Sequence, residues 1–278
     1  MLRKFGLAVT MAAGLCFVGS HAMAQDAADY TKDEQKCEGA MGKALGKEVK
    51  GISTCVKKCI TAQRKAVAPD YSGCLSLSPT DPCIVDPVKG PKAKAIVSIG
   101  KKCDPGLGKD CPFCFPNSTV PLGPISCSTG QPMPNRTQDL SLATGLSFYC
   151  IEAGAMTPDA GQAKCEDTAT KEAVKYVGAL TKCTDKCTKN AQAGKIAYDA
   201  CAPANGAPGV APSDVPTQEC ITKATDKFAD KINGVCFGAA KPACYPANPE
   251  DLITLTFTIV QNEGQYIFCG SPSGAFID

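Results

Sequence analysis

The chain has 278 residues, with 29 lysines and arginines against 27 acidic residues, 19 cysteines, one histidine and no tryptophan. Its formal net charge of +2 gives no overall attraction to an acidic polymer, so we predict that the protein does not bind nucleic acid.

Residues 1–24 have the features of an export signal. Met1-Leu-Arg-Lys is a short basic start, Phe5 to Gly19 is almost entirely apolar, and Ala22-Met-Ala24 is a cleavage signal. The apolar run is too short to cross a membrane and no later run is long enough, so we predict no membrane span. Removal of this segment takes away His21, the single histidine. An imidazole base, a histidine zinc site and a histidine-ligated haem are then excluded, and we expect no cofactor and no metal site.

Cysteine is the dominant residue of what remains. Loss of Cys16 with the signal leaves 18 cysteines, an even number. In an exported protein, abundant and even cysteine indicates disulfides. We therefore predict a periplasmic or extracellular protein.

One cysteine pattern occurs twice along the chain. Cys37 and Cys55 are 18 residues apart, as are Cys165 and Cys183. Eight cysteines of each copy match in order: Cys37, Cys55, Cys59, Cys74, Cys83, Cys103, Cys111 and Cys150 in the first, and Cys165, Cys183, Cys187, Cys201, Cys220, Cys236, Cys244 and Cys269 in the second. The sequence thus predicts two tandem modules, residues 25–160 and 161–278, after a signal peptide at 1–24.

Each module is expected to begin with two helices. Eighteen residues make five helical turns, so Cys37 and Cys55 share one face with an apolar stripe. That stripe is Met41, Leu45, Val49, Ile52, Val56 and Ile60 in the first copy, and Ala169, Val174, Val177, Leu180 and Cys183 in the second. The second helices are expected to start near Pro91 and Pro216 and to end at Cys103 and Cys236.

After the helices the periodicity changes. Residues 251–260 alternate and are β-branched, 261–264 suit a turn, and 265–269 suit a second strand. Residues 139–143 and 146–150 are a weaker copy. The predicted fold class is therefore α+β, with an antiparallel helical hairpin followed by a small antiparallel β-hairpin in each disulfide-rich module.

Antiparallel helices constrain how the cysteines pair. The start of the first helix lies beside the end of the second, which pairs Cys37 with Cys103, and the far ends pair Cys55 and Cys59 with Cys83 and Cys74. The remaining predicted pairs are Cys111–Cys150, Cys114–Cys127, Cys165–Cys236, Cys183–Cys220, Cys187–Cys201 and Cys244–Cys269.

Few patterns suggest catalysis. Cys111-Pro-Phe-Cys114 has the spacing of a thioredoxin-type active site, but it follows a predicted helix instead of opening one. Ser98-Ile-Gly-Lys101 matches the serine–lysine nucleophile pattern on a face expected to be solvated. The acidic pairs Asp81/Asp86 and Glu250/Asp251 are candidates for carboxylate chemistry, which needs no histidine.

Charge is distributed unevenly. Residues 36–66 carry eight basic residues against Glu38 and Glu48, and residues 89–102 add five lysines, whereas residues 242–278 carry four acids and no base. Solvated helix faces account for this pattern. The alternative is that the basic helices of module 1 bind an anionic envelope polymer, or the acidic end of another copy in head-to-tail assembly.

The lysine–cysteine helix at Gln35–Cys103, repeated at Ala163–Cys236, resembles a family of uncharacterised, exported, cysteine-rich bacterial proteins with repeated helical-hairpin modules. The resemblance implies architecture and carries no activity, ligand or catalytic residue. We therefore predict a disulfide-stabilised structural or binding protein of the bacterial envelope or exterior, without a catalytic site. The alternative is an extracytoplasmic enzyme, either a thiol–disulfide oxidoreductase using Cys111 and Cys114 or a carboxylate-based hydrolase.

Overall fold

The computed structural model describes residues 31–66, 74, 82–109, 148–149, 159–197, 200–201, 212–246, 251–253 and 256. The predicted signal peptide lies outside these residues. No helix in the described ranges is long and apolar enough to cross a membrane.

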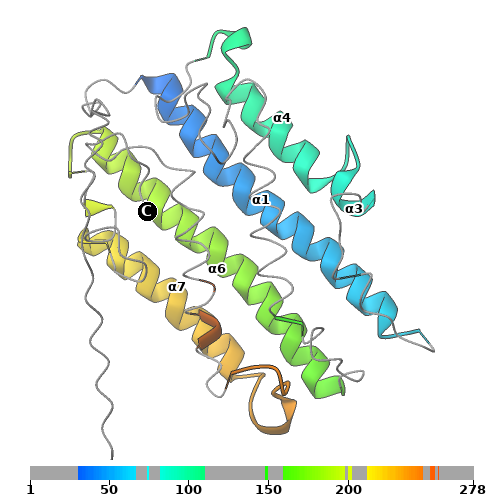
Figure 1. The fold of residues 1–278 in the computed structure, drawn as a ribbon. Coiled ribbons are helices and arrows are strands. Elements are labelled where there is room, and N and C mark those ends of the chain that lie inside the picture. Colours follow the sequence, from blue (N-terminus) through cyan, green and yellow to red (C-terminus); the bar gives the residue numbers. More distant parts are fainter. Residues whose placement is uncertain are drawn as a thin grey trace, which may run out of the picture.

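Four long helices lie side by side in the order α4, α1, α6, α7 (Figure 1). Their bounds are Lys32–Gln63 for α1, Pro91–Cys103 for α4, Ala160–Gln192 for α6 and Val215–Asn233 for α7. A short helix, α3 (Pro82–Val85), precedes α4, and the 3-10 turns η2 (Pro105–Leu107) and η5 (Gly238–Ala240) follow α4 and α7. Each module therefore contributes one hairpin, and the longer helices of the two hairpins meet in the middle of the layer.

Both central helices begin with the same local device. Thr31 accepts a hydrogen bond from the backbone N–H of Glu34, whose side chain in turn accepts one from the backbone N–H of Thr31. Asp159 and Gln162 form the same reciprocal pair at the start of α6. Such a capping box pairs backbone N–H groups that a helix start leaves without partners, so it fixes where the helix begins.

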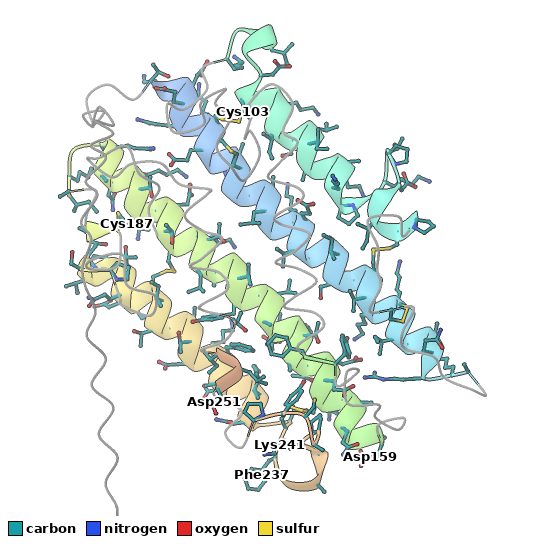
Figure 2. All side chains as sticks on the ribbon, viewed as in Figure 1. Cys103, Asp159, Cys187, Phe237, Lys241 and Asp251 are labelled. Carbon is teal, nitrogen blue, oxygen red and sulfur yellow. A yellow bond between two sulfur atoms is a disulfide. The ribbon has the colours of Figure 1, made fainter. Side chains whose placement is uncertain are left out.

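Six disulfides between described cysteines hold the hairpins together. Cys37 near the start of α1 is bonded to Cys103 at the end of α4, and Cys165 is bonded to Cys236 at the equivalent place (Figure 2). The far ends are closed by Cys55–Cys83, Cys59–Cys74, Cys183–Cys220 and Cys187–Cys201. Each bond joins cysteines that the antiparallel-hairpin argument pairs. Cys244 is also disulfide-bonded, and the cysteines at 111, 114, 127, 150 and 269 lie outside the described residues.

The α+β prediction is wrong for the described part of the chain, which is helical and contains no strand. Residues 251–253 and 256, expected to open a strand, have helical backbone. Their buried positions are Leu252, Ile253 and Thr256, a helical spacing, and the Thr256 hydroxyl donates 2.8 Å to the Leu252 carbonyl one turn earlier. Burial against the helices of module 2 thus overrides the alternating pattern. Phe148 is helical too, and the remaining residues of both predicted β-hairpins lie outside the described residues.

The described residues form two buried clusters, one in each hairpin, and two adjacent aromatic residues link them. Phe148 packs in the module 2 cluster with its ring centroid 6.4 Å from that of Phe228. Tyr149, the next residue, packs in the module 1 cluster against Ile52 and Val56. This dipeptide therefore fastens the two modules to each other through their cores.

Candidate functional site

Only some of the residues that the sequence offered for catalysis belong to the described part of the chain. Cys111, Cys114, Asp81 and Glu250 lie outside the described residues. Asp86 accepts hydrogen bonds from the backbone N–H groups of Val88 and Lys89, which lower its pKa, so it stabilises a turn. Asp251 is exposed. Within the described ranges, no group of three histidine, cysteine or acidic side chains lies close enough to hold a metal ion.

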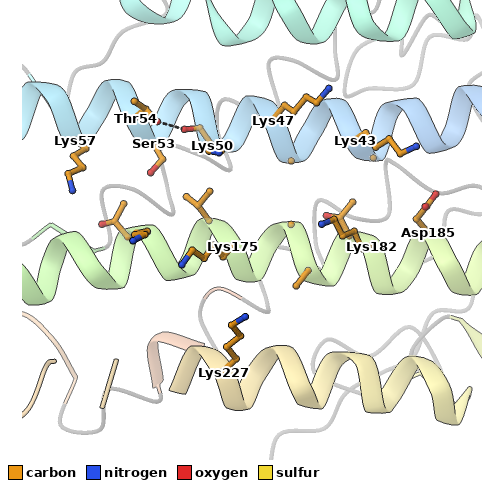
Figure 3. Close-up of a pocket in the computed structure, with 18 of the residues that line it drawn as sticks. Lys43, Lys47, Lys50, Ser53, Thr54, Lys57, Lys175, Lys182, Asp185 and Lys227 are labelled. Carbon is orange, nitrogen blue, oxygen red and sulfur yellow. Dashed lines mark hydrogen bonds between the residues drawn. The ribbon is translucent and has the colours of Figure 1, made fainter. Parts of the chain in front are cut away.

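A basic groove of about 810 Å³, here called the central groove, lies between α1 and α6 (Figure 3). Helix α1 lines it with Gly39, Gly42, Lys43, Gly46, Lys47, Lys50, Ser53, Thr54 and Lys57. Helix α6 lines it with Asp167, Thr170, Lys171, Val174, Lys175, Gly178, Ala179, Thr181, Lys182 and Asp185, and α7 adds Lys227. Lysines thus border a floor of small residues, and Figure 3 shows them on both helices.

A second basic groove, the side groove, lies between α1 and α4 and has a volume of about 940 Å³. It shares Lys43 and Lys47 with the central groove. None of the described residues that line it is acidic, and its two valines, Val88 and Val97, are exposed. Its other basic residues are Lys32, Lys36, Lys94, Lys101, Lys102 and Lys189. Lys101 lines it together with Ser98, so the serine–lysine pattern of the sequence belongs to this basic surface.

Few of these lysines are neutralised. Of the fourteen that line the two grooves, four form ion pairs within the described residues: Lys36 with Asp33, Lys57 with Asp167, Lys175 with Glu172 and Lys189 with Asp185. The other ten form no ion pair with a described carboxylate: Lys32, Lys43, Lys47, Lys50, Lys94, Lys101, Lys102, Lys171, Lys182 and Lys227. Concentrating this many cations on two adjoining grooves raises the local potential well above what the net charge of the chain suggests.

The acids of the central groove do not form a hydrolytic pair. Asp167 and Asp185 are 18 residues apart on α6, which is about 27 Å along a helix. Glycosidase carboxyl pairs are separated by about 5–10 Å. Both groups are also ion-paired with lysine, Asp167 with Lys57 at 2.9 Å and Asp185 with Lys189 at 2.6 Å.

A cluster of buried charges closes one end of the α1–α6 contact. Arg64 donates to Glu166 at 2.6 Å and to Asp167 at 3.1 Å, and its guanidinium lies over the Tyr149 ring, 5.6 Å from the centroid. Burial acts to lower the pKa of Arg64, but the bond to Glu166 and the charges of Asp167 and Glu166 outweigh it and raise the pKa. The hydrogen bonds and ion pairs of this cluster join the two modules.

The tyrosines around this cluster are structural donors. Burial raises the pKa of Tyr149 and of Tyr245 well above the ordinary value, so both stay neutral at physiological pH. Tyr149 donates to Asp167 at 3.2 Å, and Tyr245 donates to the Phe148 carbonyl at 2.6 Å. Both hydroxyls are thus held at the module junction.

The charge of each segment does not reveal that module 2 contributes to the basic surface. Helix α6 carries Glu166, Asp167, Glu172 and Asp185 among its lysines, so a count of net charge by segment hides their arrangement. The available signal was the spacing of Lys171, Lys175 and Lys182, at steps of four and seven residues, which places them along one face of a helix.

Comparison with protein-family models, with curated proteins and with solved structures finds no match for this chain. The resemblance to exported cysteine-rich bacterial proteins therefore stays a prediction.

Proposed function

We propose that this protein is an exported, disulfide-stabilised binding protein without a catalytic site, and that its basic face binds an anionic polymer of the cell envelope. One observation carries the proposal: ten lysines that form no ion pair with a described carboxylate line two adjoining grooves. Like charges held this close repel one another, and a polyanion would remove that repulsion while releasing its own counterions.

The scaffold supports a binding role. Six disulfides and two capping boxes fix the helices that carry the lysines. The helix backbone is therefore already ordered before a ligand binds, which lowers the entropy cost of binding. The disulfides and the lack of a membrane-spanning helix among the described residues fit a protein of an oxidising compartment.

The test is a calorimetric titration of the purified, oxidised protein with long-chain polyphosphate and, separately, with polygalacturonate. The variant K43E/K47E/K50E removes three groove lysines of α1. Its matched control, K58E/K65E/K231E, makes the same charge change at exposed lysines that line neither groove. We expect at least about tenfold weaker binding for the groove variant, and affinity that falls with added salt.

Equal loss in both variants, or no binding of either polymer, contradicts the proposal. Light scattering on the same samples tests the competing partner, a second copy of the chain. Particle size that grows with protein concentration at low salt would support head-to-tail assembly instead of polymer binding.

A further inference from the structure

The two sides of the central groove are copies of each other. All nine residues that α1 contributes have a counterpart 128 positions later among the residues that α6 contributes. Lys43 corresponds to Lys171, Lys47 to Lys175, and Ser53 to Thr181. The same offset relates Cys37 to Cys165, so the duplicated modules expose equivalent helix faces to one another.

The contacts at the two ends of the groove obey the same relation. Arg64, just beyond the end of α1, donates to Glu166 near the start of α6. Gln192, at the end of α6, donates to Glu38 near the start of α1. Each of these residues is 128 positions from its counterpart in the other contact.

This reciprocity defines the symmetry of the groove. When residue i meets residue j, and the counterpart of j meets the counterpart of i, the interface has the pattern of a two-fold symmetric dimer. The two helices therefore run antiparallel, and an internal two-fold axis crosses the groove near its middle.

The floor of the groove is open because of glycines that the packing does not need. A Cβ atom added to Gly46 or to Gly178 would meet no heavy atom within 4 Å. Glycine inside a helix costs roughly 0.5–1 kcal/mol relative to alanine, and here no close helix approach explains it. An unobstructed floor between lysines is what a ligand lying in the groove requires.

Near the axis the copies differ in charge. Lys50 on α1 corresponds to Gly178 on α6, so only one of these two equivalent positions carries a cation. At one end of the groove, Lys57 forms an ion pair with Asp167. At the other end, the counterpart of Lys57 is Asp185 and the counterpart of Asp167 is Gly39. A Cβ atom added to Gly39 would lie 3.4 Å from a carboxylate oxygen of Asp185. Glycine at positions 178 and 39 thus avoids a second lysine near Lys50 and a second carboxylate near Asp185.

The lining also restricts the chemistry of the ligand. Among the described residues, no aromatic side chain lines the central groove, so this lining offers no surface on which bases would stack. The basic residues of its described lining are all lysines, which act as point charges and lack the planar fork with which arginine binds carboxylates and phosphates, so the lining favours a ligand by its density of charge. A flexible chain of phosphates without rings meets both conditions.

We propose that the central groove is one site with an approximate two-fold axis, lined by both module 1 and module 2, that holds a single linear phosphate chain along α1 and α6. This rests on the proposed function and makes it specific. Lys43 to Lys57 span fourteen residues, so the bound segment is about 21 Å long. Because Lys43 and Lys47 on α1 are repeated as Lys171 and Lys175 on α6, a chain entering in either direction meets an equivalent pair of lysines.

The experiment compares long-chain polyphosphate with tripolyphosphate, which reaches only one half of the groove. The full-length oxidised protein should bind the long chain at least about tenfold more tightly, because both halves act on one molecule. In K171E/K182E, which changes only module 2, that preference should fall to about twofold or less.

The matched variant is K94E/K101E, which makes the same charge change at lysines that line only the side groove. We expect it to keep the preference for the long chain. The four lysines are exposed, so we expect both variants to fold, and thermal melting of each variant checks this.

The outcomes separate the two proposals. If no polymer binds, the proposed function itself fails. If polyphosphate binds and K171E/K182E keeps the full length preference, or only K94E/K101E loses it, the ligand lies in the side groove and the symmetric site is wrong. If polygalacturonate binds and polyphosphate does not, polymer binding stands and the phosphate assignment is wrong.

Discussion

The two helical hairpins of this protein have the same disulfides but different interiors. In module 2, Tyr176 stacks on Phe228 with centroids 5.2 Å apart, and its hydroxyl lies 2.9 Å from that of Thr225. Counted from the matching cysteines, Glu48 of module 1 corresponds to Tyr176, and Ala95 corresponds to Phe228. Glu48 is 1% exposed and Ala95 is 3% exposed.

This difference shows what a duplicated cysteine pattern constrains. The disulfides fix where two helices meet and in which register, because each requires its Cα atoms within about 7 Å. The residues between them are free to change in kind, provided that the packing between the helices stays filled. Module 2 therefore has an aromatic pair where module 1 has a buried glutamate and an alanine.

The largest expected effect comes from removing the aromatic anchor of module 2. Phe228→Ala leaves a cavity beside Tyr176 and Phe148, so it should lower the free energy of unfolding by about 3–5 kcal/mol. Chemical denaturation followed by circular dichroism measures the loss. Phe237→Ala is the control, because Phe237 is 86% exposed and should change stability by less than about 0.5 kcal/mol.

Deleting the long-range disulfide of each module should have the next largest effect. The variants C37A/C103A and C165A/C236A open loops of 66 and 71 residues, and each should lose about 2–4 kcal/mol. The loops are nearly equal, so the entropy lost in the unfolded chain is nearly equal as well.

The two disulfide variants differ in what still holds each hairpin. Tyr176 and Phe228 hold α6 and α7 together without the bond, whereas α1 and α4 lack such a pair. Calorimetry should therefore show a lower melting temperature for C37A/C103A. A lower melting temperature for C165A/C236A would mean that the aromatic pair does not compensate.

A smaller effect is expected at the starts of the outer helices. Asp214 caps α7 by accepting hydrogen bonds from the backbone N–H and the hydroxyl of Thr217, at 3.0 and 2.6 Å. Asp214→Ala should therefore cost about 1 kcal/mol in a denaturant titration.

Gly90 takes the same position at α4, with no side-chain hydrogen bond. A Cβ there would lie 2.5 Å from the Ile84 carbonyl oxygen, so Gly90→Ser should destabilise the protein although serine is a good cap. A stabilising Gly90→Ser would contradict this account of why α4 has no capping side chain.

The smallest effect concerns acid. A hydrogen bond from Lys36, with the charge of Lys109 nearby, lowers the pKa of Asp33 below 3.8, whereas the counterpart position in module 2 is Gly161. A lowered pKa stabilises the fold above the unfolded value, and this contribution disappears as the pH falls through the folded value.

The first turn of α1 should therefore lose protection against hydrogen exchange as the pH drops below about 3.8. Asp33→Asn should make this loss smaller, because the variant has no carboxylate to protonate at that position. An equal loss of protection in the Asn variant would show that Asp33 is not responsible.

Several features could be predicted from particular residues. The stripe Met41, Leu45, Val49, Ile52, Val56 and Ile60 is buried as its spacing predicts, because a helix with one apolar side has one way to face a partner. In α6 the prediction held for Ala169, Val177 and Leu180 but not for Val174, which lines the central groove. The sequence pattern does not identify Tyr176, one of the principal core residues of module 2, because it is a single aromatic residue among lysines.

The sequence by itself determined the two helical hairpins, since covalent bonds and helical periodicity depend on local spacing. Only the tertiary structure decided that residues 251–256 are helical in part, because burial at Leu252, Ile253 and Thr256 outweighs their alternating pattern. It also decided that the modules meet through α1 and α6, and so that lysines of both line one groove. No local sequence pattern predicts how the modules dock, because the docking depends on contacts such as that of Arg64 with Glu166, which are 102 residues apart.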